Sequence, residues 1–92
     1  MEFHEICQTI VDSYFQGKNL EIYYPRTENN PEGWREIELH SITTDIPPQG
    51  EKLVIGKDRL SPGHILNAYD TGAKDGDLRS FIIGKIKRTR SA

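Results

Sequence analysis

The sequence predicts a small, mainly β domain with one N-terminal helix, and three observations lead to this class. The 92 residues fit a single domain. The first sixteen residues have the apolar spacing of an amphipathic helix, and the remainder alternates short apolar runs with turn-forming residues. A helix (residues 1–17) packed on about five short strands (residues 19–90) favours a strongly curved antiparallel sheet or small barrel.

The helix is expected over residues 2–16. Its apolar residues recur at steps of three and one, which places them on one face: Phe3, Ile6, Cys7, Ile10, Val11 and Tyr14. Glu5 lies in the first turn, where the helix dipole favours acids, and Gly17 follows the last periodic residue. The apolar face must pack on the rest of the chain or on a second copy. Cys7 within it is expected to be a buried structural thiol.

Three strands are expected in the first half of the β region. Residues 20–24 alternate and are rich in strand formers, and Pro25 ends the run. Residues 34–43 form a longer strand, and residues 51–56 a short third one. In the second strand, Ile37 and Leu39 share one face, and the opposite face carries Trp34, Glu36, Glu38, His40 and Ile42.

The second half is less uniform. Ser61 and Pro62 resemble a helix N-cap followed by proline at the first helical position, which would make residues 64–69 a short helix. A strand over the same residues is the competing interpretation and the one we favour. Residues 79–88 are expected to form the last strand, in which Gly84 indicates a bulge or a sharp bend.

Composition excludes several functional classes. The net charge of −2 produces no overall attraction to nucleic acid or membranes, although the end of the chain is locally basic. The single cysteine cannot form an internal disulfide, and neither a secretory signal nor a membrane-spanning run is present, so we expect a soluble cytoplasmic protein. No catalytic motif and no short-spaced set of metal ligands occurs. We therefore expect a protein that is not an enzyme and needs no metal or cofactor.

Two apolar runs resemble the end of a WYL domain. Residues 64–70, His-Ile-Leu-Asn-Ala-Tyr-Asp, match the family's aromatic-aromatic-leucine strand that runs into Ala-Tyr-Asp. Residues 79–86, Arg-Ser-Phe-Ile-Ile-Gly-Lys-Ile, match its Arg-x-Phe-x-Leu-Asp-Arg-Ile strand, and residues 35–39 resemble its Arg-x-hydrophobic-x-Pro strand. The chain departs from the pattern where His64-Ile65 replaces Trp-Tyr, where Leu39 replaces the proline, and where Gly84-Lys85 replaces Asp-Arg.

The resemblance implies an Sm-like or SH3-like barrel that serves as a sensing module. WYL domains are generally thought to bind nucleic acids or other anionic ligands and to regulate an attached effector. For this chain, the resemblance implies a stand-alone regulatory module, or a subunit that acts on a partner, and in either case one that binds single-stranded nucleic acid or a small anionic, nucleotide-type ligand.

The candidate ligand-binding residues are Arg79, Lys85, His64, Arg35 and Tyr24. Arg79 and Lys85 lie six residues apart, so on one extended strand both would face the same side and could hold a phosphate-bearing chain. The competing interpretation is that these charges deter edge-to-edge strand pairing. His64 could stack on a base and donate to a phosphate, but a histidine at such a position is more often a partly exposed strand residue.

Two aromatic residues are ambiguous in the same way. Tyr24 could stack on a base, although a tyrosine at a strand end more often packs against the core. Trp34 either lies on a binding face or covers the core.

A second class of function stays open. The six-residue apolar face of the helix could dock on a larger protein or on a second copy. The chain would then be a protein–protein adaptor or a homodimerising subunit.

Overall fold

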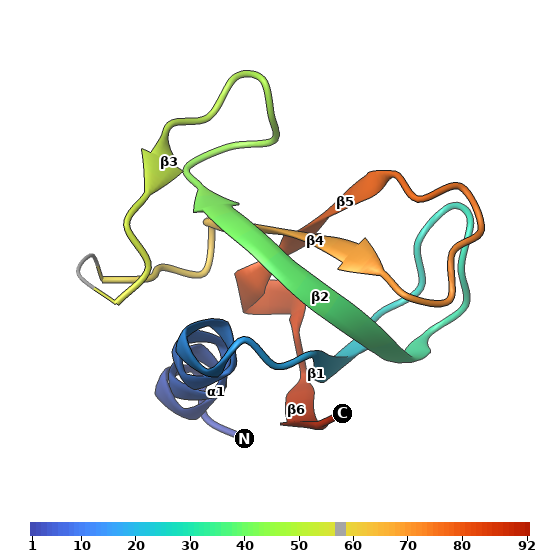
Figure 1. The fold of residues 1–92 in the computed structure, drawn as a ribbon, viewed down its shortest axis with the longest axis horizontal. Helices are drawn as coiled ribbons and strands as arrows, with labels where there is room; N and C mark the ends of the chain where they lie inside the picture. The colour runs from blue at the N-terminus through green and yellow to red at the C-terminus, as the bar shows by residue number, and fades with distance from the viewer. Residues whose placement is uncertain (57–58) are drawn as a thin grey trace.

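The computed structural model describes residues 1–56 and 59–92, which form a helix and a six-stranded antiparallel sheet (Figure 1). The strands lie in the order β5-β4-β2-β1-β6, and β3 pairs with the end of β2. The elements are α1 (Phe3–Gln16), β1 (Leu20–Tyr24), β2 (Gly33–Thr43), β3 (Lys52–Leu53), β4 (Ile65–Asp70), β5 (Leu78–Ile82), the 3-10 helix η1 (Ile83–Lys85) and β6 (Arg88–Ser91).

Helix α1 confirms the prediction from apolar spacing. The Glu5 carboxylate accepts a 3.0 Å hydrogen bond from the Glu2 backbone N–H, and Gly17 ends the helix in the left-handed conformation at φ 64°. Ile6 and Ile10 enter the common core with the sheet, and the helix contacts β6 and β2 (Figure 1). Cys7 is half-buried beside this core, and its burial raises the pKa of the thiol. No helix in the described part of the chain is long and apolar enough to cross a membrane.

Strands β1 and β2 form where expected, with one correction. β1 alternates between buried and half-buried residues, and it pairs with β2 in a register that sets Ile22 opposite Arg35. A register shift between Leu39 and Ser41 interrupts the pairing of β2 with β4. Because the extra residue reverses the alternation, Ile42 lies in the core at 0% exposure and not on the face of the exposed His40.

The short strands β3 and β4 resolve two further predictions. The third strand is only Lys52–Leu53, much shorter than residues 51–56, although Ile55 beyond it still packs in the core. Residues 65–70 form strand β4 and not a helix. β4 is buried from Ile65 to Ala68 because it lies between β2 and β5.

The prediction of one continuous strand over residues 79–88 is wrong. β5 ends at Ile82, η1 turns the chain, and β6 begins at Arg88 on the opposite edge of the sheet. The predicted bend at Gly84 is confirmed as part of η1, where the Gly84 N–H donates a 2.9 Å hydrogen bond to the Pro62 carbonyl. Arg79 and Lys85 therefore do not lie on one extended segment, and the spacing argument that paired them fails.

The sheet does not close into a barrel in the described residues, because β5 and β6 at its two edges each pair with one strand. The two edge strands nevertheless follow one another in the chain and are joined by η1. A side chain also connects the two sides, since the Ile82 N–H on β5 donates a 2.9 Å hydrogen bond to the Tyr24 hydroxyl on β1. The core between α1 and the curved sheet consists of Ile6, Ile10, Leu20, Ile22, Tyr24, Ile37, Ile42, Ile55, Leu66, Ala68, Phe81, Ile83 and Ile86.

Candidate ligand-binding groove

A groove of about 650 Å³ lies between two loops of the sheet. Both loops are at the right-hand end of the sheet in Figure 1. One wall is the loop between β1 and β2, and the other is the loop between β4 and β5. The second loop is held against β2, because the Thr71 N–H donates a 3.0 Å hydrogen bond to the Glu36 carbonyl. A smaller hollow of about 230 Å³ adjoins this space, and Arg35 and Arg79 line both. We call the two together the arginine groove.

Arg35 lines both parts of the arginine groove. Since it is opposite Ile22 in the register, its side chain leaves β2 on the inner face of the sheet. Its guanidinium carbon lies 5.6 Å from the ring centroid of Tyr24 and 5.6 Å from that of Phe81. Thr27 Oγ1 accepts a hydrogen bond of 3.4 Å from the guanidinium. Among residues 1–56 and 59–92 no carboxylate forms an ion pair with Arg35, so the aromatic rings fix the cation without neutralising it.

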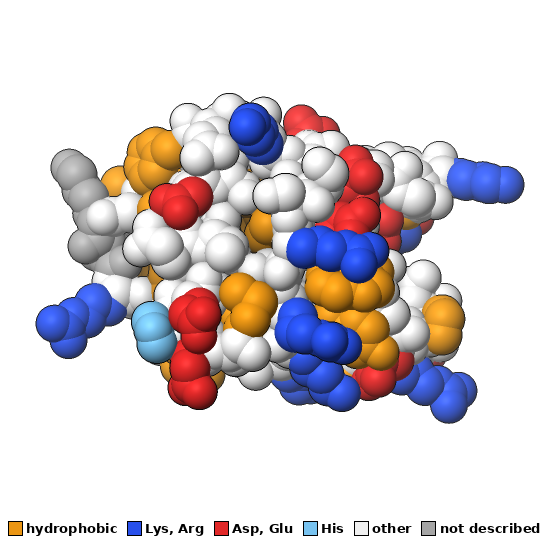
Figure 2. Space-filling view, turned by 90° about the horizontal axis from the view of Figure 1, so that it is seen from below, with side chains coloured by type: hydrophobic (Ala, Val, Ile, Leu, Met, Phe, Trp, Pro, Cys, Tyr) orange, Lys and Arg blue, Asp and Glu red, His pale blue; other side chains and the backbone are white. Residues whose placement is uncertain are grey.

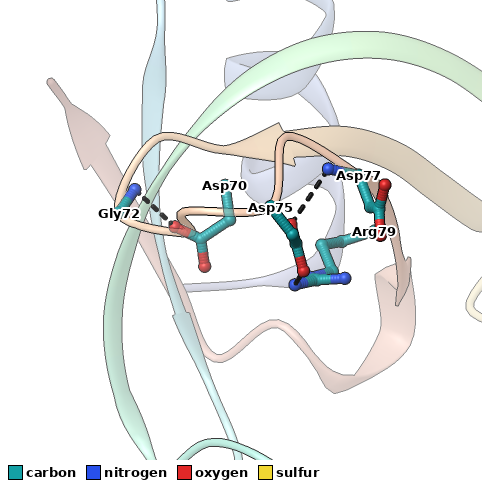
Figure 3. A network of polar contacts seen from close by, with 5 residues as sticks. All are labelled: Asp70, Gly72, Asp75, Asp77 and Arg79. Carbon is teal, nitrogen blue, oxygen red and sulfur yellow. Dashed lines mark hydrogen bonds and ion pairs between the residues drawn. The ribbon is translucent and has the colours of Figure 1, made fainter.

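Arg79 differs from Arg35, because it forms an ion pair with a carboxylate on the neighbouring loop. The Asp75 carboxylate lies 2.5 Å from the Arg79 guanidinium and also accepts a 3.0 Å hydrogen bond from the Asp77 N–H (Figure 3). The Asp77 N–H and the Arg79 cation together hold the pKa of Asp75 below its ordinary value. In return, the Asp75 carboxylate raises the pKa of Arg79. Asp75 thus pairs with the Arg79 cation in the structure.

The other charges around the arginine groove are mostly engaged in the fold. Asp70 accepts a 2.9 Å hydrogen bond from the Gly72 N–H (Figure 3), and Glu36 accepts one of 3.0 Å from the Asn19 side chain. Glu32 forms an ion pair of 3.0 Å with Lys87 outside the groove. Three acids and three cations line the larger space, yet each of these acids has a polar partner. The formal charges that line the larger space therefore balance, and the groove has no strongly positive field.

The structure brings together three of the five predicted site residues. Arg35 and Arg79 line the arginine groove, and Tyr24 contributes its ring beneath Arg35. Tyr24 is only 5% exposed and its hydroxyl is bonded to Ile82, so it supports the site more than it presents a stacking face. Lys85 lies in η1, exposed and outside the residues that line the groove.

His64 is also placed outside the arginine groove, in the turn before β4. Its Nδ1 accepts a 3.1 Å hydrogen bond from the Ser61 N–H, and its backbone carbonyl accepts one of 3.0 Å from the Ile83 N–H. The first contact stabilises the turn itself, and the second joins the turn to η1. His64 therefore has a structural role in the fold described here.

Sequence reasoning missed Phe81, Thr27 and Lys74 as residues of the groove. Phe81 stands in the Arg-Ser-Phe motif, and that motif is the signal that could have identified it. Thr27 and Lys74 lie on loops, where no periodic pattern identifies a binding residue. Within the described ranges, no group of three or more His, Cys, Asp or Glu side chains is arranged to hold a metal ion.

Comparison of the chain with models of protein families, with curated proteins and with solved structures finds no match. The resemblance to WYL domains therefore stays a prediction. The functional argument depends on the fold and on the contacts of the arginine groove.

Proposed function

We propose that this chain is a non-catalytic regulatory module of the WYL type, and that it binds a small anionic ligand of the nucleotide class in the arginine groove. The two segments that resemble the family, residues 64–70 and 79–86, support this, since strands β4 and β5 within them pair side by side. The strand order supports an Sm-like or SH3-like relationship, because the last strand returns beside the first after a 3-10 turn.

The proposal depends on the contacts of Arg35, which lies over two aromatic rings and forms no ion pair with a carboxylate of the described residues. A guanidinium held on two aromatic faces keeps most of its N–H groups available at its edge, since the π-contacts use none of the five donors and Thr27 accepts from only one of them. Arginine binds phosphate oxygens in pairs through this planar edge. A phosphate in the groove would therefore find a cation that is already positioned and has no carboxylate partner among the described residues.

The size of the groove supports a nucleotide-sized ligand. Small-molecule sites have volumes of roughly 300–1,000 Å³, and this groove has about 650 Å³. Arg79 lines the same space, so a ligand with two phosphates can engage Arg35 first and then displace Asp75 from Arg79. The ligand would thereby move the loop between β4 and β5, which gives a regulatory module its output.

The test is calorimetric titration of the protein with ATP and, separately, with pyrophosphate. Arg35→Ala should weaken binding by about tenfold or more, since it removes charge-assisted hydrogen bonds worth roughly 1.5–3 kcal/mol. Lys85→Ala is the matched control, because it removes one exposed cation outside the groove and should leave the Kd unchanged. Equal losses in the two variants would indicate unspecific charge effects and would refute the site. Failure of the parent protein to bind either probe would refute the ligand class.

A second candidate function, docking to a protein, is favoured by an apolar hollow of about 590 Å³ between α1 and β3. Val11, Tyr14, Leu53 and Ile55 line it, and Phe15 at its edge is 66% exposed. If this surface forms a homodimer, sedimentation equilibrium should give the dimer mass and Phe15→Glu the monomer mass. A parent protein that is monomeric at high concentration would exclude the homodimer.

A further inference from the structure

The hollow of about 590 Å³ between α1 and β3, which we call the apolar hollow, is a second concave site of the molecule. Both elements lie at the left-hand end of the sheet in Figure 1, and the loops of the arginine groove lie at the other end. No lining residue is shared between the apolar hollow and the arginine groove. Its hydrophobic lining residues come from two segments of the chain: Val11, Tyr14 and Phe15 on α1, and Leu53, Val54 and Ile55 on β3 and after it.

The walls of the apolar hollow are held in place by the core. Val11 and Leu53 pack against the core cluster, and Ile55 belongs to it. The Phe15 ring lies over Gly56, where a Cβ atom would be 2.7 Å from the ring atom Cε2. Phe15 is nevertheless 66% exposed. The apolar hollow is therefore formed before any partner binds, which reduces the conformational entropy that binding would cost.

One edge of β2 is open beside the apolar hollow. β1 pairs with residues 33–37 of β2, and β3 pairs with residues 42–43. Both strands lie on the edge of β2 opposite β4, because β4 pairs with residues 42–43 from the other side. Within the described part of the chain, residues 38–41 consequently have no strand partner on this edge, and His40 and Ser41 among them line the apolar hollow. A peptide backbone could pair with such an edge, and a hydrocarbon ligand could not.

Lys52 is the cation at the rim of the apolar hollow. Two other polar lining residues are engaged with each other, since His40 Nδ1 and Ser41 Oγ form a hydrogen bond of 2.9 Å. Lys52 is exposed, and no carboxylate among residues 1–56 and 59–92 forms an ion pair with it. On the face shown in Figure 2, basic side chains gather instead over β1 and β6. The apolar hollow is therefore complementary to a ligand that combines one apolar group with one acid.

The register of β3 places Lys52 and the apolar surface on opposite faces of the sheet. Leu53 is opposite the core residue Ile42, so its side chain points to the inner face, where α1 packs. Lys52 precedes it and therefore points to the outer face. The side chains of an extended peptide alternate in the same way. A peptide that turns an apolar side chain towards α1 would thus present the adjacent side chain to Lys52.

We propose that the apolar hollow binds an extended peptide segment of a partner protein, in which a large apolar residue is directly adjacent to an acidic one. The apolar side chain would fill the space between Phe15 and Leu53, the peptide backbone would pair with the open edge of β2, and the acid would pair with Lys52. A large side chain in a preformed pocket supplies much of the affinity of such interfaces. The proposal depends on the second candidate function, protein docking, and commits it to a peptide and not to a second copy of this chain. It is independent of the arginine groove.

The experiment selects peptides from a random heptapeptide library displayed on phage. The immobilised parent protein is the target, and Phe15→Ser, whose circular dichroism verifies its folding, is used to remove peptides that bind elsewhere. Peptides enriched on the parent should share a large apolar residue directly beside Asp or Glu. An enriched peptide is then synthesised with a fluorescent label, and its Kd is measured by anisotropy. Phe15→Ser should weaken its binding about tenfold or more.

A second set of variants tests the acid and the strand edge. Lys52→Met should weaken binding of the labelled peptide about two- to fivefold, since the ion pair is exposed. A peptide with the amide in place of its acid should show the same loss, and the two losses should not add. Lys85→Met removes an equally exposed cation outside the apolar hollow and is the control. Amide hydrogen exchange within residues 38–41 should slow when the peptide binds, because this edge becomes paired.

Three outcomes would overturn the proposal. The first is a selection in which no peptide is enriched on the parent over Phe15→Ser. The second is an equal loss of affinity in Lys52→Met and Lys85→Met, which would indicate a general charge effect. The third is a parent protein that sediments as a dimer and becomes monomeric in Phe15→Ser, which would show that a second copy covers the apolar hollow. Docking as the second candidate function would survive this third result. The arginine groove has its own readout, because ATP and pyrophosphate should bind Phe15→Ser as they bind the parent.

Discussion

The hydroxyl of Tyr24 on β1 accepts a hydrogen bond of 2.9 Å from the backbone N–H of Ile82 at the end of β5. These two strands do not pair in the sheet, since β1 lies between β2 and β6. The contact therefore connects two parts of the curved sheet that the backbone ladder leaves separate. It also fixes the ring of Tyr24 against Phe81, with centroids 5.1 Å apart, beneath the Arg35 guanidinium.

Replacing Tyr24 with phenylalanine removes this hydrogen bond and keeps the ring. Because the Ile82 N–H would lose its partner in a partly buried position, Tyr24→Phe should lower the free energy of unfolding by about 1–2 kcal/mol. Urea denaturation followed by circular dichroism measures the change. Tyr14→Phe, at a residue of α1 that is 41% exposed, is the control and should be nearly neutral. Equal unfolding midpoints for the two variants would show that the contact across the sheet adds no stability.

Gly84 permits the close approach of η1 to the turn before β4. A Cβ atom at this position would lie 2.7 Å from both the Cβ and the carbonyl oxygen of Pro62, and backbone atoms there cannot move aside cheaply. Gly84→Ala should therefore lower the thermal midpoint, with a cost of about 1–3 kcal/mol. At Gly63 a Cβ would meet no atom within 4 Å, so Gly63→Ala is the matched control. A Gly84→Ala protein as stable as the control would contradict the proposed close packing.

Asp75 should compete with anionic ligands for Arg79, which is a prediction that depends on the arginine groove. Asp75→Asn removes the charge that lies against the guanidinium, so the affinity for pyrophosphate should rise about two- to fivefold. Asp77→Asn removes an equal charge from the same loop, but its carboxylate does not pair with Arg79 in the structure (Figure 3). Calorimetric titration of both variants distinguishes local competition from a change in net charge. An identical gain in the two would assign the effect to net charge alone.

Glu32 should titrate at a lower pH than an ordinary glutamate. Hydrogen bonds from Lys87 and from the Tyr23 hydroxyl hold the pKa of its carboxyl below the ordinary value of 4.5. Because the folded pKa is the lower one, this interaction stabilises the protein above the unfolded pKa, and the stabilisation is lost as the pH falls through the folded pKa. NMR titration of the Glu32 side chain measures the midpoint. Lys87→Met should raise that midpoint toward 4.5, and an unchanged midpoint would refute the ion pair in solution.

Local patterns predicted those elements whose residues interact mainly with near neighbours in the chain. The apolar spacing of α1 and the alternation of β1 each follow from the geometry of one element, and both were confirmed. The last strand failed because its course depends on contacts distant in sequence. Their spacing would place Arg79 and Lys85 on the same face of one extended strand. In the structure, η1 packs on Pro62 and turns the chain between them.

The sequence by itself determined a small, mainly β chain with an N-terminal helix, and it identified Arg35, Arg79 and Tyr24 as residues of interest. Only the tertiary structure decided which cations pair with a carboxylate and which lie on aromatic rings. Arg35 lies on two rings from different strands, Asp75 holds Arg79 across a loop, and Arg88 reaches Tyr23 through a strand at the far end of the chain. The sequence shows which residues are basic. Whether a cation is neutralised by a carboxylate depends on neighbours that only the folded chain brings within a few ångströms.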